Sequence, residues 1–408
     1  MSILKPSDPS LSILEQNSNT QDVGTQLLCK LQEWGKDLGF SQIGIASVDL
    51  SHAEPGLMEW LEKGFHGEME YMSRHAALRA RPSELVPGTL SVITASMNYL
   101  PSNTPTEGSE WIQIERDRLS RPDEGVISIY ARGRDYHKVF RQRLESLAKK
   151  VRQQIGHFGY RVFTDSAPVL EVELAQQSGL GWRGKHTLLI NREGGSMFFL
   201  GEIYADIYLE PTPKTENHCG SCSACLTICP TAAIVAPYKL DARKCISYLT
   251  IEHPGPIPLE LRSKMGNHIY GCDDCQTICP WNKYAQPSTI VDFDVRPALM
   301  NTTEQEQMVK GMSGSKKLIQ YLSWSQEEFE KNTSGTPIRR IGYERWLRNI
   351  SVAMGNALRC FDKVACESDQ HASQKEIIKA LEDRAQYPSP LVKEHVSWAL
   401  SQEQVLQK

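Results

Sequence analysis

Apolar and polar positions alternate in two different ways along the chain up to about residue 210. Some stretches repeat apolar residues with the period of an amphipathic helix, and others are short runs rich in β-branched residues, which predict buried strands. The predicted strands are 40–48, 90–99, 126–130, 161–164, 187–190 and 197–208, and the predicted helices are 23–38, 56–73 with a break at 66–69, a long one ending near 156, and 168–178. Helices that alternate with strands predict an α/β or α+β domain over residues 23–210.

The pattern differs in the segments outside these elements. Residues 1–22 are polar and predict a disordered lead-in, while 101–125 are rich in Pro, Ser, Gly and Glu and predict a surface loop or insertion. After about residue 300 we recognise no strand pattern. Helical periodicity over 318–331, 343–359, 374–384 and 390–405 predicts a small helical-repeat region within 286–408.

The composition of the 408 residues, with 40% hydrophobic and 23% charged residues, is typical of a soluble globular protein with more than one domain. No apolar stretch approaches the roughly 20 residues needed to span a bilayer. The N-terminus shows neither a secretory pattern nor twin arginines, so we expect a cytoplasmic location without membrane attachment. The net charge of −4 argues against extensive coating of nucleic acid, although local basic surfaces are compatible with it.

Two cysteine runs carry the strongest chemical signal. The first is Cys219-x2-Cys222-x2-Cys225-x3-Cys229-Pro230, which is the bacterial ferredoxin spacing, and the second is Cys272-x2-Cys275-x3-Cys279-Pro280. The second run lacks one ligand, which Cys245, between the runs, can supply. The resulting eight thiols are the number that two [4Fe–4S] clusters require.

The short gaps let one loop reach three corners of a cluster, so the fourth ligand has to come from elsewhere in the chain. We assign one cluster to Cys219, Cys222, Cys225 and Cys279, and the other to Cys229, Cys245, Cys272 and Cys275. A zinc site would pair two C-x2-C units without a third cysteine, and disulfide frameworks belong to short secreted chains. The remaining cysteines, Cys29, Cys360 and Cys366, are predicted to be small buried residues.

Three further motifs need an interpretation. The run Gly179–Gly184 matches G-x-G-x-x-G, but a helix precedes it and a strand follows it, so we reject a Rossmann site. The glycines would instead let the backbone approach another group closely, with Lys185 and His186 beside that group. Asp165 either caps the next helix or donates a proton from the end of a strand. His137 lies in an incomplete D-x-H-x-x-G motif within a helix, so we do not expect it to bind cobalt.

Two basic stretches are candidates for binding a phosphate backbone. Residues 130–152 hold eight Lys or Arg against two acids, and residues 339–348 hold four arginines with Tyr343 and Trp346 between them. Such stretches are usually solvated helix faces, but together they could bind RNA by charge and by stacking on unpaired bases. The candidate contacts are Arg132, Arg134, Arg339, Arg340, Arg345 and Arg348.

Together these features resemble the epoxyqueuosine reductase family. The matching segments are HGEMEYM (66–72), RARPSELVPG (79–88), YARGRDYHKVFRQRL (130–144), 164–203 with its DSAPVLE and GLGWRGK motifs, and 219–282. The resemblance implies an α+β protein with three regions. These are a reductive-dehalogenase-like, cobalamin-binding α/β domain over 23–210, a ferredoxin-like domain with two [4Fe–4S] clusters over 211–285, and a HEAT-like α-helical tRNA-binding region over 286–408.

The resemblance also implies a site. Cobalamin would bind base-off and without a histidine ligand, and Asp165 would take the place of the family's proton donor. Arg81, Lys185 and His186 would lie in segments that line the corrin, and Asp273 would lie between the second cluster and the corrin. For Asp165 to act as an acid near neutral pH, we expect burial beside the corrin to raise its pKa.

The implied reaction is the reduction of epoxyqueuosine to queuosine at the wobble position of tRNA, the last step of queuosine synthesis. A low-potential flavodoxin or ferredoxin would send electrons through the clusters to form cob(I)alamin, and the enzyme would act as a monomer. Two alternatives stay open. A reductive dehalogenase would use the same cofactors on an organohalide, but such enzymes usually carry a twin-arginine signal and have no use for a basic tail. An electron carrier would need only residues 211–285.

Overall fold

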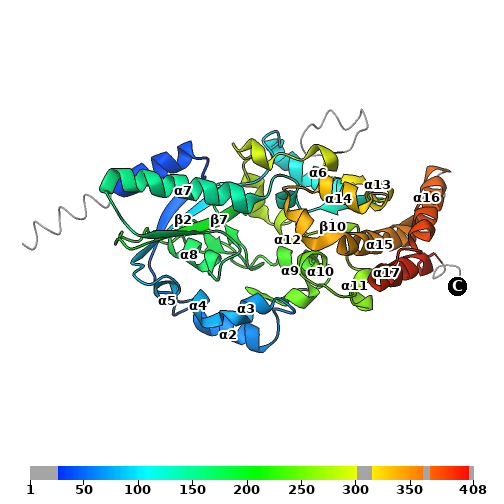
Figure 1. Cartoon of the computed structure of the whole chain (residues 1–408), viewed down its shortest axis with the longest axis horizontal. Coiled ribbons are helices and arrows are strands. Elements are labelled where there is room, and N and C mark those ends of the chain that lie inside the picture. The colour runs from blue at the N-terminus through cyan, green and yellow to red at the C-terminus, as the bar shows by residue number, and fades with distance from the viewer. Residues whose placement is uncertain (1–25, 301–314, 362–367, 404–408) are drawn as a thin grey trace, which may run out of the picture.

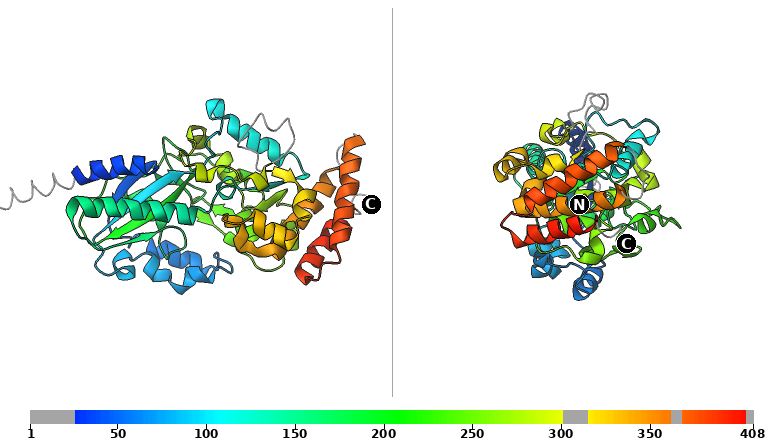
Figure 2. Two further views of the ribbon diagram at one scale, coloured as in Figure 1. Left: turned by 45° about the horizontal axis from the view of Figure 1, so that its top comes forward. Right: turned by 90° about the vertical axis from the view of Figure 1, so that its right-hand side faces the viewer.

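The computed structural model describes residues 26–300, 315–361 and 368–403 of the chain. The predicted lead-in over 1–22 lies outside these ranges. The molecule is elongated, with a β-sheet and its helices at one end and a group of helices at the other (Figures 1 and 2). The cysteine-rich segment lies between the two ends, so it contacts both of them.

A four-stranded sheet organises the first end. Its strands are β1 (Gln42–Ala46), β2 (Ser91–Asn98), β7 (Phe198–Ala205) and β4 (Tyr160–Phe163), in the order β1-β2-β7-β4, with every neighbouring pair antiparallel. A helix over 26–37 and α7 (Tyr136–Ile155) pack on one face, and α8 (Glu171–Gln177) covers the other (Figure 1). The antiparallel pairing makes this an α+β domain, which is one of the two alternatives that the sequence left open.

The segment 101–125, predicted to be a surface loop or insertion, is not a loop throughout. It contains a 3-10 turn, η1 (Glu107–Ser109), and helix α6 (Glu110–Leu119). The side chain of Trp111 is fully buried, which anchors α6 to the core of the sheet domain. The helix was missed because its other positions are mostly charged, so the apolar face is narrow.

A second, smaller sheet crosses from the first domain to the helical end. Its order is β10 (His268–Tyr270), β3 (Glu124–Ile127) and β11 (Ser315–Lys317), with β10 parallel and β11 antiparallel to β3. Strand β11 contradicts the expectation of no strand after residue 300. Its three residues, Ser-Lys-Lys, carry no apolar pattern that could have predicted it.

Short helices surround the sheets and the cysteine runs. Four of them form a group on one side of the sheet: α2 (Glu54–Glu62), α3 (Glu70–Arg74), α4 (Ala76–Arg79) and α5 (Pro82–Leu85). The predicted break at 66–69 lies between α2 and α3. The cysteine segment contains α9 (Ala224–Ile228), β8 (Ile234–Ala236), β9 (Lys239–Leu240), η3 (Ala242–Lys244), α10 (Ile246–Ile251), α11 (Leu259–Arg262), α12 (Asp274–Thr277) and η4 (Pro280–Tyr284). Helices α9 and α12, one in each cysteine run, lie against each other and so bring the two runs together.

The C-terminal region is helical, as predicted. It consists of α13 (Leu318–Leu322), α14 (Gln326–Asn332), η8 (Pro337–Ile341), α15 (Gly342–Phe361), α16 (Ser368–Arg384) and α17 (Pro390–Ser401). The helix predicted over 318–331 is two helices, because Ser325 starts α14 with a capping box completed by Glu328. Helix α15 packs on β10 as well as on α17, which joins this region to the cysteine segment. Within the described residues, every helix is too short or too polar to cross a membrane.

Candidate active site

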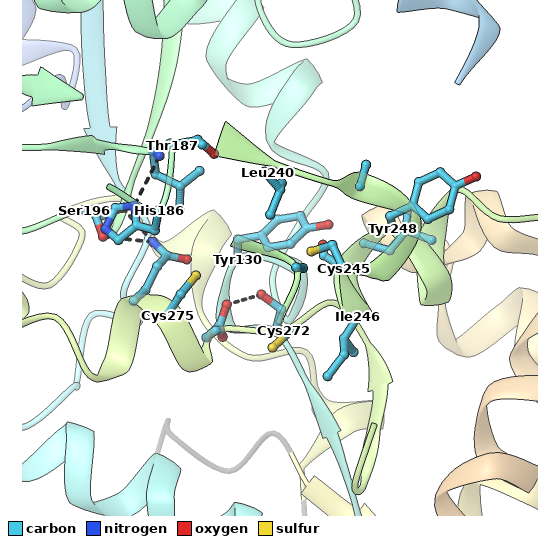
Figure 3. Close-up of a pocket in the computed structure, with 18 of the residues that line it drawn as sticks. Tyr130, His186, Thr187, Ser196, Leu240, Cys245, Ile246, Tyr248, Cys272 and Cys275 are labelled. Atoms are coloured by element: carbon cyan, nitrogen blue, oxygen red, sulfur yellow. Dashed lines mark hydrogen bonds between the residues drawn. The ribbon is translucent and has the colours of Figure 1, made fainter. Parts of the chain in front are cut away.

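A cavity of about 500 Å³ lies where the sheet domain meets the cysteine segment (Figure 3). Phe198 and Leu200 of β7 and Glu171 of α8 form part of its wall on the sheet side. Cysteines and Tyr248 of the central segment line the other side, and Arg340 of η8 reaches it from the helical region. All three predicted regions therefore contribute to one site.

Four cysteines line this cavity, and they are Cys229, Cys245, Cys272 and Cys275. Burial raises the pKa of the Cys275 thiol, and the neighbouring thiols of Cys272 and Cys245 raise it further. Burial also raises the pKa of Cys245, to which Cys229 contributes. These mutual effects place the four thiols close together, and the ten cysteines in the described ranges form no disulfide.

The other four cysteines of the runs form a second group, Cys219, Cys222, Cys225 and Cys279, outside the cavity lining. Burial raises the pKa of Cys279 to about 11, and the other three thiols contribute to the same shift. The buried ring of Trp182 and the partly buried ring of Trp281, 5.0 Å apart, shield this group together with Ile190. The division into two groups is the one that the spacing gives, and the cluster assignment itself stays a prediction.

Lys185 does not line the cavity, contrary to the sequence analysis. Its Nζ donates hydrogen bonds to the carbonyl oxygens of Gly220 and Cys222, at 2.7 Å each. The carbonyls of the first cysteine loop attract the ammonium group more strongly than the apolar cavity wall can. Lys185 therefore fastens the Cys219–Cys225 loop to the sheet domain.

Asp165 is the centre of an acid–base group on the sheet side of the cavity. Its Oδ2 accepts hydrogen bonds from the Tyr136 hydroxyl at 2.6 Å and from His137 Nε2 at 2.8 Å. The Nδ1 of His137 lies 2.7 Å from Asp135, so a second carboxylate fixes the imidazole ring. Asp165 does not cap α8, because the residue before that helix is Leu170 and no side-chain cap is present.

The protonation of this group differs from the expectation. Burial raises the pKa of Asp165, but the hydrogen bonds from His137 and Tyr136 outweigh it, so the pKa lies below its ordinary value. Burial lowers the pKa of His137, but its bonds to Asp135 and Asp165 outweigh that effect and raise it to about 9. The proton of the pair therefore resides on His137 near neutral pH, and the predicted rise in the pKa of Asp165 is wrong.

Glu171 is a site residue that the sequence analysis missed. It lines the cavity, and its Oε1 accepts a hydrogen bond from the backbone N–H of Asp165 at 2.5 Å. Burial and the negative charge of Asp165 raise the pKa of Glu171 to about 8. Its place as the last residue of the DSAPVLE motif, which begins with Asp165, was the available signal.

The remaining predicted cofactor residues separate into three cases. Arg81 lies outside the cavity lining, where its guanidinium pairs with Glu54 at 2.8 Å. Asp273 lines the cavity, but its carboxylate accepts hydrogen bonds from Ser128 and from the backbone of residue 129. His186 lines the cavity and is 3% exposed, with no partner for its Nε2 among the described residues (Figure 3). Burial lowers the pKa of His186 to about 4, so its ring is neutral.

Three of the arginines predicted to contact tRNA are structural. Arg132 is fully buried and binds both carboxylate oxygens of Glu115, at 2.7 and 2.8 Å. Arg348 is also fully buried and donates to backbone carbonyls, including that of Leu249. Arg345 donates to the carbonyls of residues 251, 340 and 341. Their partners lie far away in the sequence or are backbone atoms, so a count of charges could not identify them.

The other three arginines are accessible. Arg134 is 48% exposed beside Asp292, Arg339 is 54% exposed, and Arg340 is 47% exposed with a 2.5 Å bond to Glu252. Arg340 also lines the cavity, so it stands at the point where the cavity meets the surface.

Two predicted buried cysteines are also corrected, because Cys29 and Cys360 are exposed. Both lie on the outer sides of helices, where a cysteine need not pack against the core. The third, Cys366, lies outside the described residues.

Comparisons with known proteins agree on one family. A model described as "Epoxyqueuosine reductase QueG, DUF1730" matches residues 79–166, and one described as "4Fe-4S double cluster binding domain" matches residues 218–282. An epoxyqueuosine reductase of Alicycliphilus denitrificans is 58% identical over 379 residues, which cover 93% of this chain and 98% of the relative. An epoxyqueuosine reductase of Burkholderia pseudomallei is 51% identical and covers 92% of each chain.

A solved structure supports the fold. It is the crystal structure of an epoxyqueuosine reductase with an epoxyqueuosine-modified tRNA-Tyr stem loop, and it matches with a TM-score of 0.72. The match covers 93% of this chain and 100% of the other at 24% sequence identity. The two chains therefore share their overall architecture from the sheet domain to the helical end.

Proposed function

Because the chain belongs to the epoxyqueuosine reductase family, we propose that it reduces epoxyqueuosine to queuosine at the wobble position of tRNA. The family makes the chain an oxidoreductase. The observation that carries the proposal is a cavity with four cysteine thiols on one side and the Asp165–His137 pair on the other. Such a cavity can receive electrons from one side and protons from the other. The family does not favour the alternative of a reductive dehalogenase.

Two [4Fe–4S] clusters would occupy the two cysteine groups, with Cys245 completing the cluster at the cavity. The match to a double-cluster model and the unpaired state of all eight thiols support this assignment. Soft thiolate ligands of this kind suit iron–sulfur clusters. A low-potential flavodoxin or ferredoxin would supply the electrons one at a time.

Cobalamin would occupy the cavity. The apolar side chains of Leu189, Phe198 and Leu200 suit the face of a corrin, and the buried Nε2 of His186 would meet one of the polar groups at its edge. His137 is held by two carboxylates, which supports binding without a histidine below the cobalt. When bound, the corrin supplies the strongly reducing centre that epoxide reduction needs.

The protein's own contribution to the chemistry is a positioned proton. Epoxide opening develops negative charge on oxygen, and a group that protonates this oxygen acts as a general acid. His137 holds the proton near neutral pH, and Asp165 Oδ2, 2.8 Å away, can relay it to the substrate. The hydroxyl of Tyr136 donates a hydrogen bond to the same oxygen atom and so helps to fix it.

The tRNA would bind across the face that carries Arg134, Arg339 and Arg340. These guanidinium groups are accessible, and Arg340 stands at the edge of the cavity into which the modified base has to turn. A phosphate group could replace Glu252 as the partner of Arg340, since both are anions. Helical residues 286–408 would thus form the tRNA-binding region, with catalysis in 23–210 and electron transfer in 211–285.

We also propose that the enzyme works as a monomer in the cytoplasm. One chain supplies every wall of the cavity, so the chemistry requires no second copy. The substrate tRNA and the reduced clusters both suit that compartment.

An Asp165→Asn variant tests the proposed function. It keeps the size of the side chain but cannot relay a proton, so we expect turnover to fall by about 10²-fold or more. Cluster and cobalamin spectra should stay unchanged, and Asp206→Asn, at an exposed position after β7, is the control. Full turnover by Asp165→Asn, with both cofactors bound, would contradict the role of Asp165.

A further inference from the structure

A second acidic residue, Glu202, lies inside the sheet domain below the cavity. It is fully buried in β7, opposite Thr94 of β2 and Phe163 of β4. Neither carboxylate oxygen has a hydrogen-bond partner among the described residues. A glutamate in such a place is costly to ionise. Its position inside the sheet also gives no structural reason for an acidic side chain.

The alternation of side chains along β7 connects Glu202 to the site. Phe198 and Leu200 line the cavity, and Glu202 is the next residue on the same face of the strand. Helix α8 covers this face, and its first residue is Glu171, which also lines the cavity. Glu171 in turn accepts a hydrogen bond from the backbone N–H of Asp165. Three carboxyl groups therefore follow one another from the cavity into the core.

Electrostatics allow one of these three groups to be charged near neutral pH. Asp165 is the charged one, because it alone is paired with His137 and Tyr136. Burial and the charge of Asp165 raise the pKa of Glu171 to about 8, and burial and the charge of Glu171 raise the pKa of Glu202 well above its ordinary value. Two arginines also face these groups, since Arg340 of η8 acts on Asp165 and Arg79 of α4 acts weakly on Glu171. The other titratable groups that interact with them are the hydroxyls of Tyr71, Tyr130 and Tyr204.

We propose that Glu171 donates the second proton of the reduction at the cavity, and that Glu202 behind it stays protonated, so that Glu171 is the one of these two carboxyl groups that gives up its proton. The inference rests on the proposed function. The epoxide loses both carbon–oxygen bonds, takes up two electrons from the external donor and two protons, and leaves an alkene and one water molecule. The Asp165–His137 pair holds one proton, which passes to the epoxide oxygen as the first carbon–oxygen bond breaks and turns that oxygen into a hydroxyl group. Glu171 supplies the second proton when the hydroxyl group leaves as water. Solvent then restores both protons.

The pH profile of a Glu171→Gln variant tests the donor role. In the wild type, turnover should fall as the pH rises through about 8, because Glu171 loses its proton there. Turnover by Glu171→Gln should be slower by about 10²-fold, and its pH profile should lack the fall near pH 8. The profile should keep the fall near pH 9 that belongs to His137. Glu171→Asp, which retains an acid, should recover part of the rate and the fall in turnover at high pH that Glu171 causes.

The control is Glu173→Gln on the same helix, whose side chain pairs with Arg183 at 2.7 Å and does not line the cavity. It should keep both the rate and the pH profile. A Glu171→Gln enzyme with the wild-type profile would overturn the proposal, whether its rate is normal or reduced, since a reduced rate alone would indicate a structural role.

Infrared spectroscopy tests the protonation of Glu171 and Glu202 without any turnover. The full-length protein, before cobalamin is added, should show the carbonyl stretch of protonated carboxyl groups near neutral pH. Glu202→Gln should remove one such component, and Glu171→Gln another. Absence of these bands in the wild type would overturn the proposal even if the enzyme is active. A wild type that shows the bands but makes no queuosine would instead contradict the proposed function.

Discussion

Arg132 and Arg340 lie in the two basic stretches, yet the structure predicts opposite results for their removal. Arg132 has no exposed surface, and its guanidinium forms two bonds of 2.7 and 2.8 Å to Glu115 and one of 2.8 Å to the carbonyl of Ile127. In Arg132→Ala, Glu115 would remain buried with Arg118 as its cation. Breaking a buried ion pair costs about 3–5 kcal/mol, and the remaining partner favours the lower end of that range.

Arg340 is 47% exposed and pairs with the carboxylate of Glu252, so Arg340→Ala should lower the free energy of unfolding by less than about 1 kcal/mol. Its loss should instead weaken tRNA binding and reduce the slope of log Kd against log salt by about 0.7. Urea denaturation and a salt titration of tRNA affinity measure the two effects separately. Arg116→Ala, at an exposed position on α6, is the control for both.

Two results would contradict the different roles of Arg132 and Arg340. If Arg132→Ala left the free energy of unfolding unchanged but weakened tRNA binding, its buried pairing with Glu115 would be wrong. If Arg340→Ala left the salt slope unchanged, the tRNA surface would have to lie elsewhere.

Three other substitutions test the site. Cys245→Ser should lose the cluster at the cavity and keep the other, so cluster iron should fall by half; a full complement of iron would contradict the assignment. Lys185→Gln removes two bonds to the first cysteine loop, so the cluster there should be lost faster on exposure to a chelator, and equal loss rates would refute this anchoring role. The raised pKa of His137 contributes stability that is complete below pH 6.5 and is lost as the pH rises through about 9. The Tm difference between wild type and His137→Gln should therefore shrink over that range, and a constant difference would argue against the ion pair.

The elements and residues that the sequence predicted well have local causes. The strands at β1, β2 and β7 are rich in apolar and β-branched residues, and helix α15 has a strong apolar stripe, so each is recognisable without knowledge of its neighbours. The division of the cysteines also follows from local spacing, because a short loop can reach three corners of a cluster but not the fourth.

The errors concern residues whose state depends on distant partners. Arg132 is buried because Glu115, in a segment that looks like a loop, folds into α6 and meets it in the core. The pKa of Asp165 is low because His137 reaches it from helix α7. Glu202 has the sequence environment of an ordinary strand residue, and only the sheet register places it beneath the cavity. Charge patterns give no information about such pairings until the tertiary structure is known.

This chain is proposed to reduce epoxyqueuosine in tRNA by means of cobalamin and two [4Fe–4S] clusters. The most direct test gives anaerobically purified protein a low-potential reductant and tRNA carrying epoxyqueuosine, with and without cobalamin, and identifies the nucleosides by mass spectrometry. We expect queuosine in the sample with cobalamin and unchanged epoxyqueuosine without it. Unchanged epoxyqueuosine in both samples, or equal conversion in both, would contradict it.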